Sequence, residues 1–253
     1  MNKKLIIRIP VTVLLVTLIT APVLFNFSGC VAVLDQAIVV SGKLNEELDR
    51  QVASCKPDFE FAGLQQTTQG INPDKFSILS WNSHRGTHEN WHKDLISYGS
   101  GADIILLQEA ALNPVLDIQL DLAANQWLMA AAFYLDNQEI GILSAARVSP
   151  QAYCVTREAE PILKIPKIGL AAAYPFAGLE TRLLVVNIHM VNFTIKTDAM
   201  QRQIGALEHL VKIHDGPVIV AGDFNTWSSE RESLVHKKMT ELGMSPVRSG
   251  PHS

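Results

Sequence analysis

The stretch that decides the expected fold is Val218 to Trp227, which reads Val-Ile-Val-Ala-Gly-Asp-Phe-Asn-Thr-Trp. It opens with four apolar residues that follow a turn signal at Asp215-Gly216-Pro217, and this pattern predicts a buried strand entered from a turn. Side chains two apart in an extended backbone share one side, so we expect Asp223 and Asn225 to face one pocket. The alternative is ordinary turn chemistry, because Gly, Asp and Asn all favour tight turns.

Three further apolar runs also end in a polar side chain. They are Phe76 to Trp81 before Asn82, Ile104 to Leu107 before Gln108-Glu109, and Leu183 to Ile188 before His189. Each polar residue alone has an ordinary structural explanation as a cap, a turn residue or a solvated group. Binding sites collect at strand ends in layered α/β folds, because the scaffold is rigid and the loops are open. The shared placement therefore predicts one common site.

The chemistry of this set suits metal-assisted attack on a phosphate ester. Mg²⁺, with Mn²⁺ as an alternative, prefers oxygen ligands, so we expect Asn82 and Glu109 to hold the metal. We expect Asp223 to orient or deprotonate the attacking water. His189 and Asn225 would stabilise the charge that builds on the phosphate oxygens. Zinc fits worse, because the sequence has no pair of histidines or cysteines at ligand spacing.

Four motifs in order resemble those of the endonuclease/exonuclease/phosphatase superfamily: Trp81-Asn82, Gln108-Glu109, Asn187-Ile188-His189 and Gly222-Asp223-Phe224-Asn225. The resemblance covers about Phe76 to Val247, and the runs 157–163 and 185–193 are similar to the YafD-like bacterial branch. It implies an α/β fold, the DNase I-like four-layer α/β/β/α sandwich, and Mg²⁺-dependent phosphodiester or phosphomonoester hydrolysis. It also implies the metal, phosphate and nucleophile roles assigned above.

The chain departs from the superfamily pattern after Asn225. Members of the superfamily continue through a further Asp-bearing strand to a Ser-Asp-His motif, whereas only 28 of the 253 residues follow Asn225 here. His252 has no aspartate before it, so we do not assign it the role of that histidine. We expect a sandwich that is incomplete at its C-terminal end. Two hypotheses stay open: a metal-dependent phosphoesterase, and an inactive family member that acts as a binding module or remnant.

Residues 1–30 predict a signal peptide or membrane anchor. Three basic residues precede a charge-free run from Ile9 to Phe25, as in an export signal. The sequence Ser28-Gly29-Cys30 resembles a bacterial lipoprotein cleavage box, in which Cys30 would carry the lipid. The alternative is an uncleaved span from Ile9 to Leu34, which is long enough to cross a bilayer. Either interpretation predicts an exported protein of the periplasm or cell envelope that is held at the membrane by its N-terminus.

Residues 31–75 are interpreted as a stalk or linker that precedes the catalytic domain at 76–253. Apolar residues recur at roughly helical spacing from Leu34 to Val52, which predicts a helix. Further helices are expected over Trp91 to Tyr98, Asn113 to Ala124 and Asp198 to His214, the last with Met200, Ile204, Leu207 and Val211 as its buried stripe.

Cysteine usage agrees with export. If Cys30 carries lipid, Cys55 and Cys154 remain, and such a pair can persist as a disulfide in an oxidising compartment. The alternative is two separate buried thiols.

Charge bears on the substrate. The net charge is −4, and removal of the first 29 residues, with three positive charges and no negative one, would take it to −7. A protein this acidic has no global attraction for a phosphate backbone. The phosphoester substrate could therefore be a lipid, a nucleotide or a nucleic acid, with lipid or small phosphoesters favoured, and no protein partner is inferred.

Overall fold

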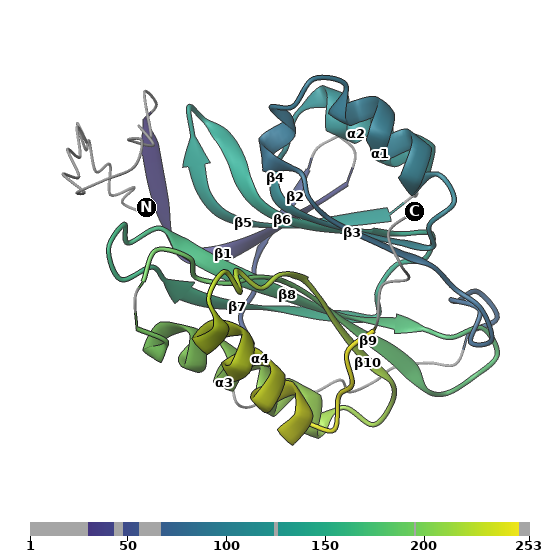
Figure 1. Ribbon diagram of the computed structural model, residues 1–253. Coiled ribbons are helices and arrows are strands. Elements are labelled where there is room, and N and C mark those ends of the chain that lie inside the picture. The colour runs from purple at the N-terminus through teal and green to yellow at the C-terminus, as the bar shows by residue number, and fades with distance from the viewer. Residues whose placement is uncertain (1–29, 43–47, 56–66, 124–125, 195, 248–253) are drawn as a thin grey trace.

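The structure is a computed structural model that describes residues 30–42, 48–55, 67–123, 126–194 and 196–247. Figure 1 shows two β-sheets packed face to face, each covered on its outer side by helices. The layers follow the order helix, sheet, sheet, helix. The predicted four-layer α/β/β/α sandwich is therefore confirmed.

Within the described residues, the first sheet has six strands in the order β2-β1-β5-β6-β4-β3. Its strands are β1 (Val31–Ser41), β2 (Asp49–Val52), β3 (Ile78–Asn82), β4 (Ile104–Ala111), β5 (Gln126–Leu135) and β6 (Gln138–Ala146). β3 and β4 are parallel, so their connection must cross over, and it contains the short 3-10 helix η1 (His84–Gly86) and α1 (Trp91–Gly99). α2 (Pro114–Ala123) follows β4 and lies beside α1 on the outer face of this sheet.

The second sheet, as far as the chain is described, has four strands in the order β10-β9-β8-β7. They are β7 (Ala152–Ala159), β8 (Pro166–Pro175), β9 (Arg182–His189) and β10 (Val218–Asp223). β9 and β10 are parallel and are joined by α3 (Asp198–Ile213), and α4 (Ser229–Glu241) follows β10. No described strand pairs with the outer side of β10, whose six residues are all only partly buried.

The core has three apolar layers because the central strands are covered on both faces. Along β4, Ile104 and Leu106 pack toward the second sheet, whereas Ile105 and Leu107 pack under α1 and α2. This explains why β4 and β9 read as continuous apolar runs rather than as alternating ones. The buried face of α3 contains Met200, Ile204 and Leu207 as predicted, with Leu210 in place of Val211.

The predicted stalk helix within residues 31–75 is wrong for the part that the structure describes. Residues 31–41 form β1, which pairs with β5 and β2 inside the first sheet, and Asp49–Val52 forms β2. The physical reason lies in residue type: β1 contains five Val or Ile residues, whose branched side chains favour strands. The pattern of helical spacing that we followed instead runs through residues 43–47, which lie outside the described residues.

The structure bears on the N-terminal predictions only from residue 30 onward. Residues 1–29 lie outside the described residues, and none of the described helices is long and apolar enough to cross a membrane. Residues 31–34 of the alternative bilayer span belong to β1, so that alternative is wrong for them. Cys30 has an exposed free thiol, and its backbone N–H donates to Asp136 Oδ1 at 2.9 Å. Its lipidation stays a prediction.

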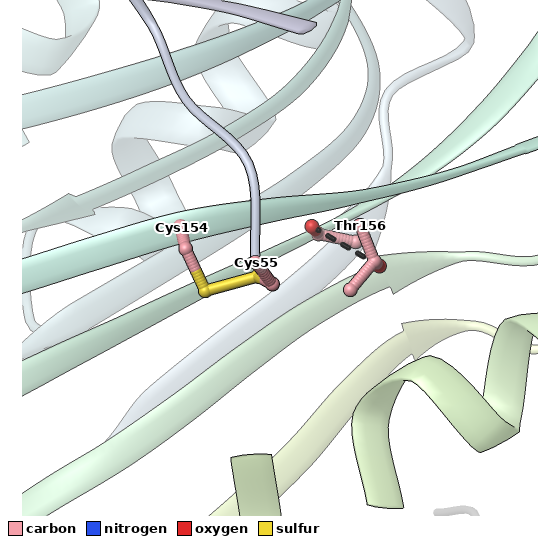
Figure 2. The surroundings of a disulfide bond; sticks show 4 residues. Cys55, Cys154 and Thr156 are labelled. Carbon is pink, nitrogen blue, oxygen red and sulfur yellow. Dashed lines mark hydrogen bonds between the residues drawn. A yellow bond between two sulfur atoms is a disulfide. The ribbon is translucent and has the colours of Figure 1, made fainter. Parts of the chain in front are cut away.

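A disulfide joins Cys55 to Cys154, two residues that are 99 positions apart in the sequence. Figure 2 shows the segment after β2 coming down onto β7, with the bond lying close to Thr156. The Cys55 backbone N–H also donates to Val155 O at 3.0 Å, and the Cys154 side chain is fully buried. The bond therefore ties a segment that leaves the first sheet to a strand of the second.

Removal of this disulfide is expected to destabilise the fold by about 3 to 4 kcal/mol, because the crosslink closes a long loop in the unfolded chain. The measurement is denaturant unfolding of the double variant Cys55→Ala/Cys154→Ala against the parent. The parent in reductant should match the double variant, and Cys30→Ala should match the oxidised parent. Equal unfolding free energies for the double variant and the oxidised parent would contradict the expectation.

Candidate active site

The polar residues at the four strand ends come together where the two parallel strand pairs meet. The Asn82 amide, at the end of β3, donates to Asp223 Oδ2, at the end of β10, at 2.9 Å. His189 Nε2, at the end of β9, lies 3.6 Å from the same Asp223 oxygen and 3.9 Å from Glu109 Oε1. One small anion or cation can therefore contact all of these side chains. The cluster draws residues from both sheets, which only the packing of the sandwich brings together.

Local backbone geometry orients the side chain of Glu109. Glu109 has a φ of 49° and lies where the pairing of β4 with β6 shifts register between Leu107 and Ala110. Such a bulge turns a side chain away from the direction that regular pleating would give it. A positive φ is uncommon for a residue with a Cβ, and residues held in this conformation cluster at functional sites.

Asn225 reaches the site by a turn and not by strand alternation. β10 ends at Asp223, Asn225 has a φ of 49°, and its backbone N–H donates to Asp223 Oδ1 at 2.9 Å. Its side-chain amide donates to Met190 O at 2.9 Å and so ties the loop after β10 to the loop after β9. The turn chemistry that we weighed as an alternative thus operates here. Asn225 supports Asp223 and the neighbouring loop.

A buried amide pair lies directly beneath the site and joins the two sheets. Gln108 Nε2 donates to Asn187 Oδ1 at 2.7 Å, and Asn187 Nδ2 donates to Leu143 O at 2.9 Å. Both side chains are buried, so their hydrogen bonds form where water cannot replace them. Gln108 precedes Glu109 and Asn187 lies two residues before His189. The pair therefore sets the distance between those two functional side chains.

Lys167 is a site residue that sequence reasoning missed. It lies on β8, and its Nζ is 3.0 Å from His189 Nε2. Burial lowers the pKa of Lys167, while Glu160, Glu109 and Asp223 act in the opposite direction. The available signal was that Lys167 is the one charged residue in an otherwise apolar strand, Pro166–Pro175.

His189 is neutral at neutral pH. Burial and the positive charge of Lys167 lower its pKa to about 4, against the opposing effects of Asp223 and Glu109. An ammonium group has donors only, so His189 Nε2 must accept the hydrogen bond from Lys167 and the imidazole proton lies on Nδ1. The predicted role of His189 as a donor to phosphate oxygens requires a proton on Nε2, whereas in this arrangement Lys167 supplies the N–H groups.

His84 is a second residue that the sequence reading missed. It lies in η1 with a φ of 46°, and its Nδ1 is 3.4 Å from Glu109 Oε2. Its ring is half-exposed, so it forms part of the outer wall of the site. His252, at the end of the chain, lies outside the described residues.

The residues at the site fit a hard divalent cation. Glu109 and Asp223 supply two carboxylates against one ammonium, and with His189 neutral the rim keeps a net negative charge. Carboxylate and amide oxygens are the donors that Mg²⁺ prefers, and Mg²⁺ commonly takes only one or two protein carboxylates and keeps its remaining waters. Among the described residues, no group of three or more His, Cys, Asp or Glu side chains is arranged to hold a metal ion, so amide oxygens and water would have to complete the coordination. This donor set therefore suits Mg²⁺ or Mn²⁺ better than a structural zinc.

The fold is that of phosphoesterase- and nuclease-type hydrolases, and comparison with known proteins gives the family. Residues 79–250 match the Endonuclease/Exonuclease/phosphatase family, and the chain belongs to it. The chain is 34% identical over 190 residues to a UPF0294 protein of Erwinia tasmaniensis, covering 74% of this chain and 69% of the relative. A UPF0294 protein of Klebsiella pneumoniae is 34% identical over 199 residues, covering 76% of this chain and 74% of the relative. These relatives confirm the predicted YafD-like branch.

A solved structure shows the same fold at lower identity. The crystal structure of ANGEL2, described as a 2′,3′-cyclic phosphatase in complex with adenosine-2′,3′-vanadate, has a TM-score of 0.50 and 16% identity. The likeness covers 69% of this chain and 61% of that chain. At this identity it concerns the fold alone.

Proposed function

We propose that the protein is a divalent-metal-dependent phosphoesterase whose site is the Asn82, Glu109, Lys167, His189 and Asp223 cluster. The observation that carries the proposal is that His189 Nε2 lies 3.9 Å from Glu109 Oε1 and 3.6 Å from Asp223 Oδ2, which brings residues from strands of both sheets together. The family is one of phosphoesterase- and nuclease-type hydrolases, which gives the reaction class.

In this proposal each residue has a role that follows from its contacts. Glu109 and the Asn82 amide oxygen, which also accepts from the His84 backbone N–H at 3.1 Å, would hold the metal, and the metal would supply Lewis-acid stabilisation of the phosphoryl oxygens. Asp223 accepts hydrogen bonds from the Asn82 side-chain amide on Oδ2 and from the Asn225 backbone N–H on Oδ1, so its carboxylate is held in place to orient water. The Lys167 ammonium donates to the phosphoryl oxygens, and His189 positions it.

We also propose that the protein acts outside the cytoplasm. The disulfide between Cys55 and Cys154 supports this location, because disulfides persist in oxidising compartments. The basic and then apolar start of the sequence supports it too. Attachment to the membrane through the N-terminus, with or without lipid on Cys30, belongs to the same proposal.

The test is hydrolysis of a phosphoester panel by the full chain with Mg²⁺, with Mn²⁺ and with chelator. The panel contains a p-nitrophenyl phosphodiester, p-nitrophenyl phosphate, a dinucleotide and a phospholipid. We expect turnover of at least one class that chelator abolishes and Mg²⁺ restores. Absence of turnover across the panel, in a protein that is folded and oxidised, would overturn the proposal in favour of a non-catalytic binding role.

A further inference from the structure

An apolar pocket of about 430 Å³ lies at the edge of the candidate site. We call it the rim pocket, and it is lined by Ile162, Asn192, Phe193, Thr194 and Trp227. Three of these residues are large and apolar and are nevertheless exposed: Ile162 by 70%, Trp227 by 60% and Phe193 by 37%. Single exposed apolar residues need no explanation, but three that line one hollow form a candidate surface for an apolar group.

The rim pocket is built from the same loops that carry the site. Asn192 and Phe193 follow His189 closely on the loop after β9, and Trp227 lies two residues after Asn225 on the loop after β10. Ile162 lies on the turn between β7 and β8. A hydrogen bond connects that turn to the loop after β9: Glu160 Oε1 accepts from the Asn192 backbone N–H at 2.9 Å. A ligand that occupies the site therefore has the rim pocket beside it.

Trp227 is held in place although most of its surface is exposed. Its Nε1 donates to Asn192 Oδ1 at 2.8 Å, and the Arg231 guanidinium lies 5.0 Å from its ring centroid. Arg231 is itself buried and donates to the carbonyl oxygens of Asn225 and Val191, on the two loops that flank the pocket. An aromatic wall that is already ordered loses little entropy when a ligand packs against it.

The wall of the rim pocket favours a hydrocarbon group over a group that needs hydrogen bonds. Trp227 Nε1 and Asn192 Oδ1 bond to each other, and Thr194 Oγ1 donates to Lys196 O at 2.7 Å. These three polar atoms thus already have partners, and most of the exposed lining is the apolar surface of Ile162, Phe193 and Trp227. The net charge of −4 also argues against a long polyanionic ligand.

We propose that the rim pocket binds the hydrocarbon portion of an amphiphilic phosphoester whose phosphate lies at the Glu109, Lys167 and His189 cluster. This inference rests on the proposed phosphoesterase function and adds the substrate class to it. The volume of the pocket is within the range of small-ligand sites and accommodates a short alkyl chain or the first part of a longer one.

The test is a series of p-nitrophenyl alkyl phosphodiesters with methyl, butyl and hexyl groups, each kept below its micelle concentration. In the full chain with Mg²⁺, kcat/KM should rise about two- to fourfold for each added methylene, since complete burial of a methylene contributes roughly 0.8 kcal/mol, which is about fourfold. Ile162→Ser and Phe193→Ser should each flatten this dependence. Val115→Ser and Ile118→Ser, two exposed apolar positions on α2, should leave it as in the parent.

Each outcome decides one question. Turnover that does not change with chain length overturns the rim pocket assignment and leaves the proposed function intact. Faster turnover of p-nitrophenyl thymidine 5′-phosphate than of the hexyl ester, lost in Phe193→Ser, also overturns it, because the pocket then takes a base. If no ester is hydrolysed, the proposed function fails, and calorimetric titration with hexylphosphonate and methylphosphonate still tests the pocket. Tighter binding of the hexyl compound that Ile162→Ser abolishes supports it, and equal binding overturns it.

Discussion

Replacement of Glu109 by glutamine is expected to lower metal-dependent phosphoester hydrolysis by about a thousandfold or more while the protein stays folded. The substitution keeps the size of the side chain and removes the negative charge that faces His189 and His84. Losing a carboxylate ligand weakens the binding of the metal and so reduces the stabilisation of the charged transition state. His189→Ala is expected to lower turnover by about a hundredfold, like the loss of Lys167 itself, because the buried imidazole holds the Lys167 ammonium in the site.

The matched control for Glu109→Gln is Glu139→Gln. Glu139 is a partly buried carboxylate on β6 that pairs with Arg50 at 3.0 Å, away from the site. It should retain the turnover of the parent. Calorimetric titration with Mg²⁺ supplies a readout besides turnover, and Glu109→Gln should bind the metal more weakly than Glu139→Gln. Turnover like that of the parent in Glu109→Gln would remove Glu109 from the proposed mechanism.

Lys167→Met is expected to lower kcat/KM by about a hundredfold, since it removes one preorganised donor to the phosphoryl oxygens while keeping most of the side-chain volume. It should also raise the pKa of His189 from about 4, because the positive charge of Lys167 is one cause of its lowering. Burial remains the larger cause, so the pKa should stay below its ordinary value. The measurement is an NMR titration of the imidazole in metal-free protein alongside the kinetics.

Lys212→Met is the control for the loss of a positive charge. Lys212 lies exposed on α3, where it pairs with Glu208, and its replacement should leave both the kinetics and the His189 titration unchanged. If Lys167→Met gave the turnover of the parent and an unchanged His189 titration, Lys167 would have only a packing role. A loss of turnover with an unchanged titration would contradict the electrostatic part of the explanation.

Local sequence patterns predict some of the site residues, whereas long-range strand pairing places the others. Asn82, Glu109, His189 and Asp223 were predictable because each follows a run of apolar residues, and such a run both forms a buried strand and ends at the rim of the sheet. Lys167 was not predicted, because it lies at the start of its strand, whereas the other site residues follow the ends of theirs. The antiparallel pairing of β8 with β9 brings that end beside His189.

The N-terminal segment shows the same division. The valines and isoleucines of β1 favour a strand, but periodic spacing alone indicated a helix, and both patterns are weak over a few residues. The decisive factor is the edge of β5, which offers unpaired backbone groups that β1 satisfies. No local pattern in residues 31–41 indicates that their partner strand, β5, lies much later in the sequence.

The sequence by itself determined the α/β class, the family, the central strands and the polar residues at their ends. These follow from short-range patterns of apolar and polar side chains, which can be recognised without the tertiary structure. Only the tertiary structure decided that Lys167 lies against His189, that Gln108 and Asn187 hold the two sheets together, and that Arg231 supports Trp227 at the rim pocket. These contacts depend on sheet packing and strand register, which are set by the summed burial of the whole core rather than by any one stretch of the chain.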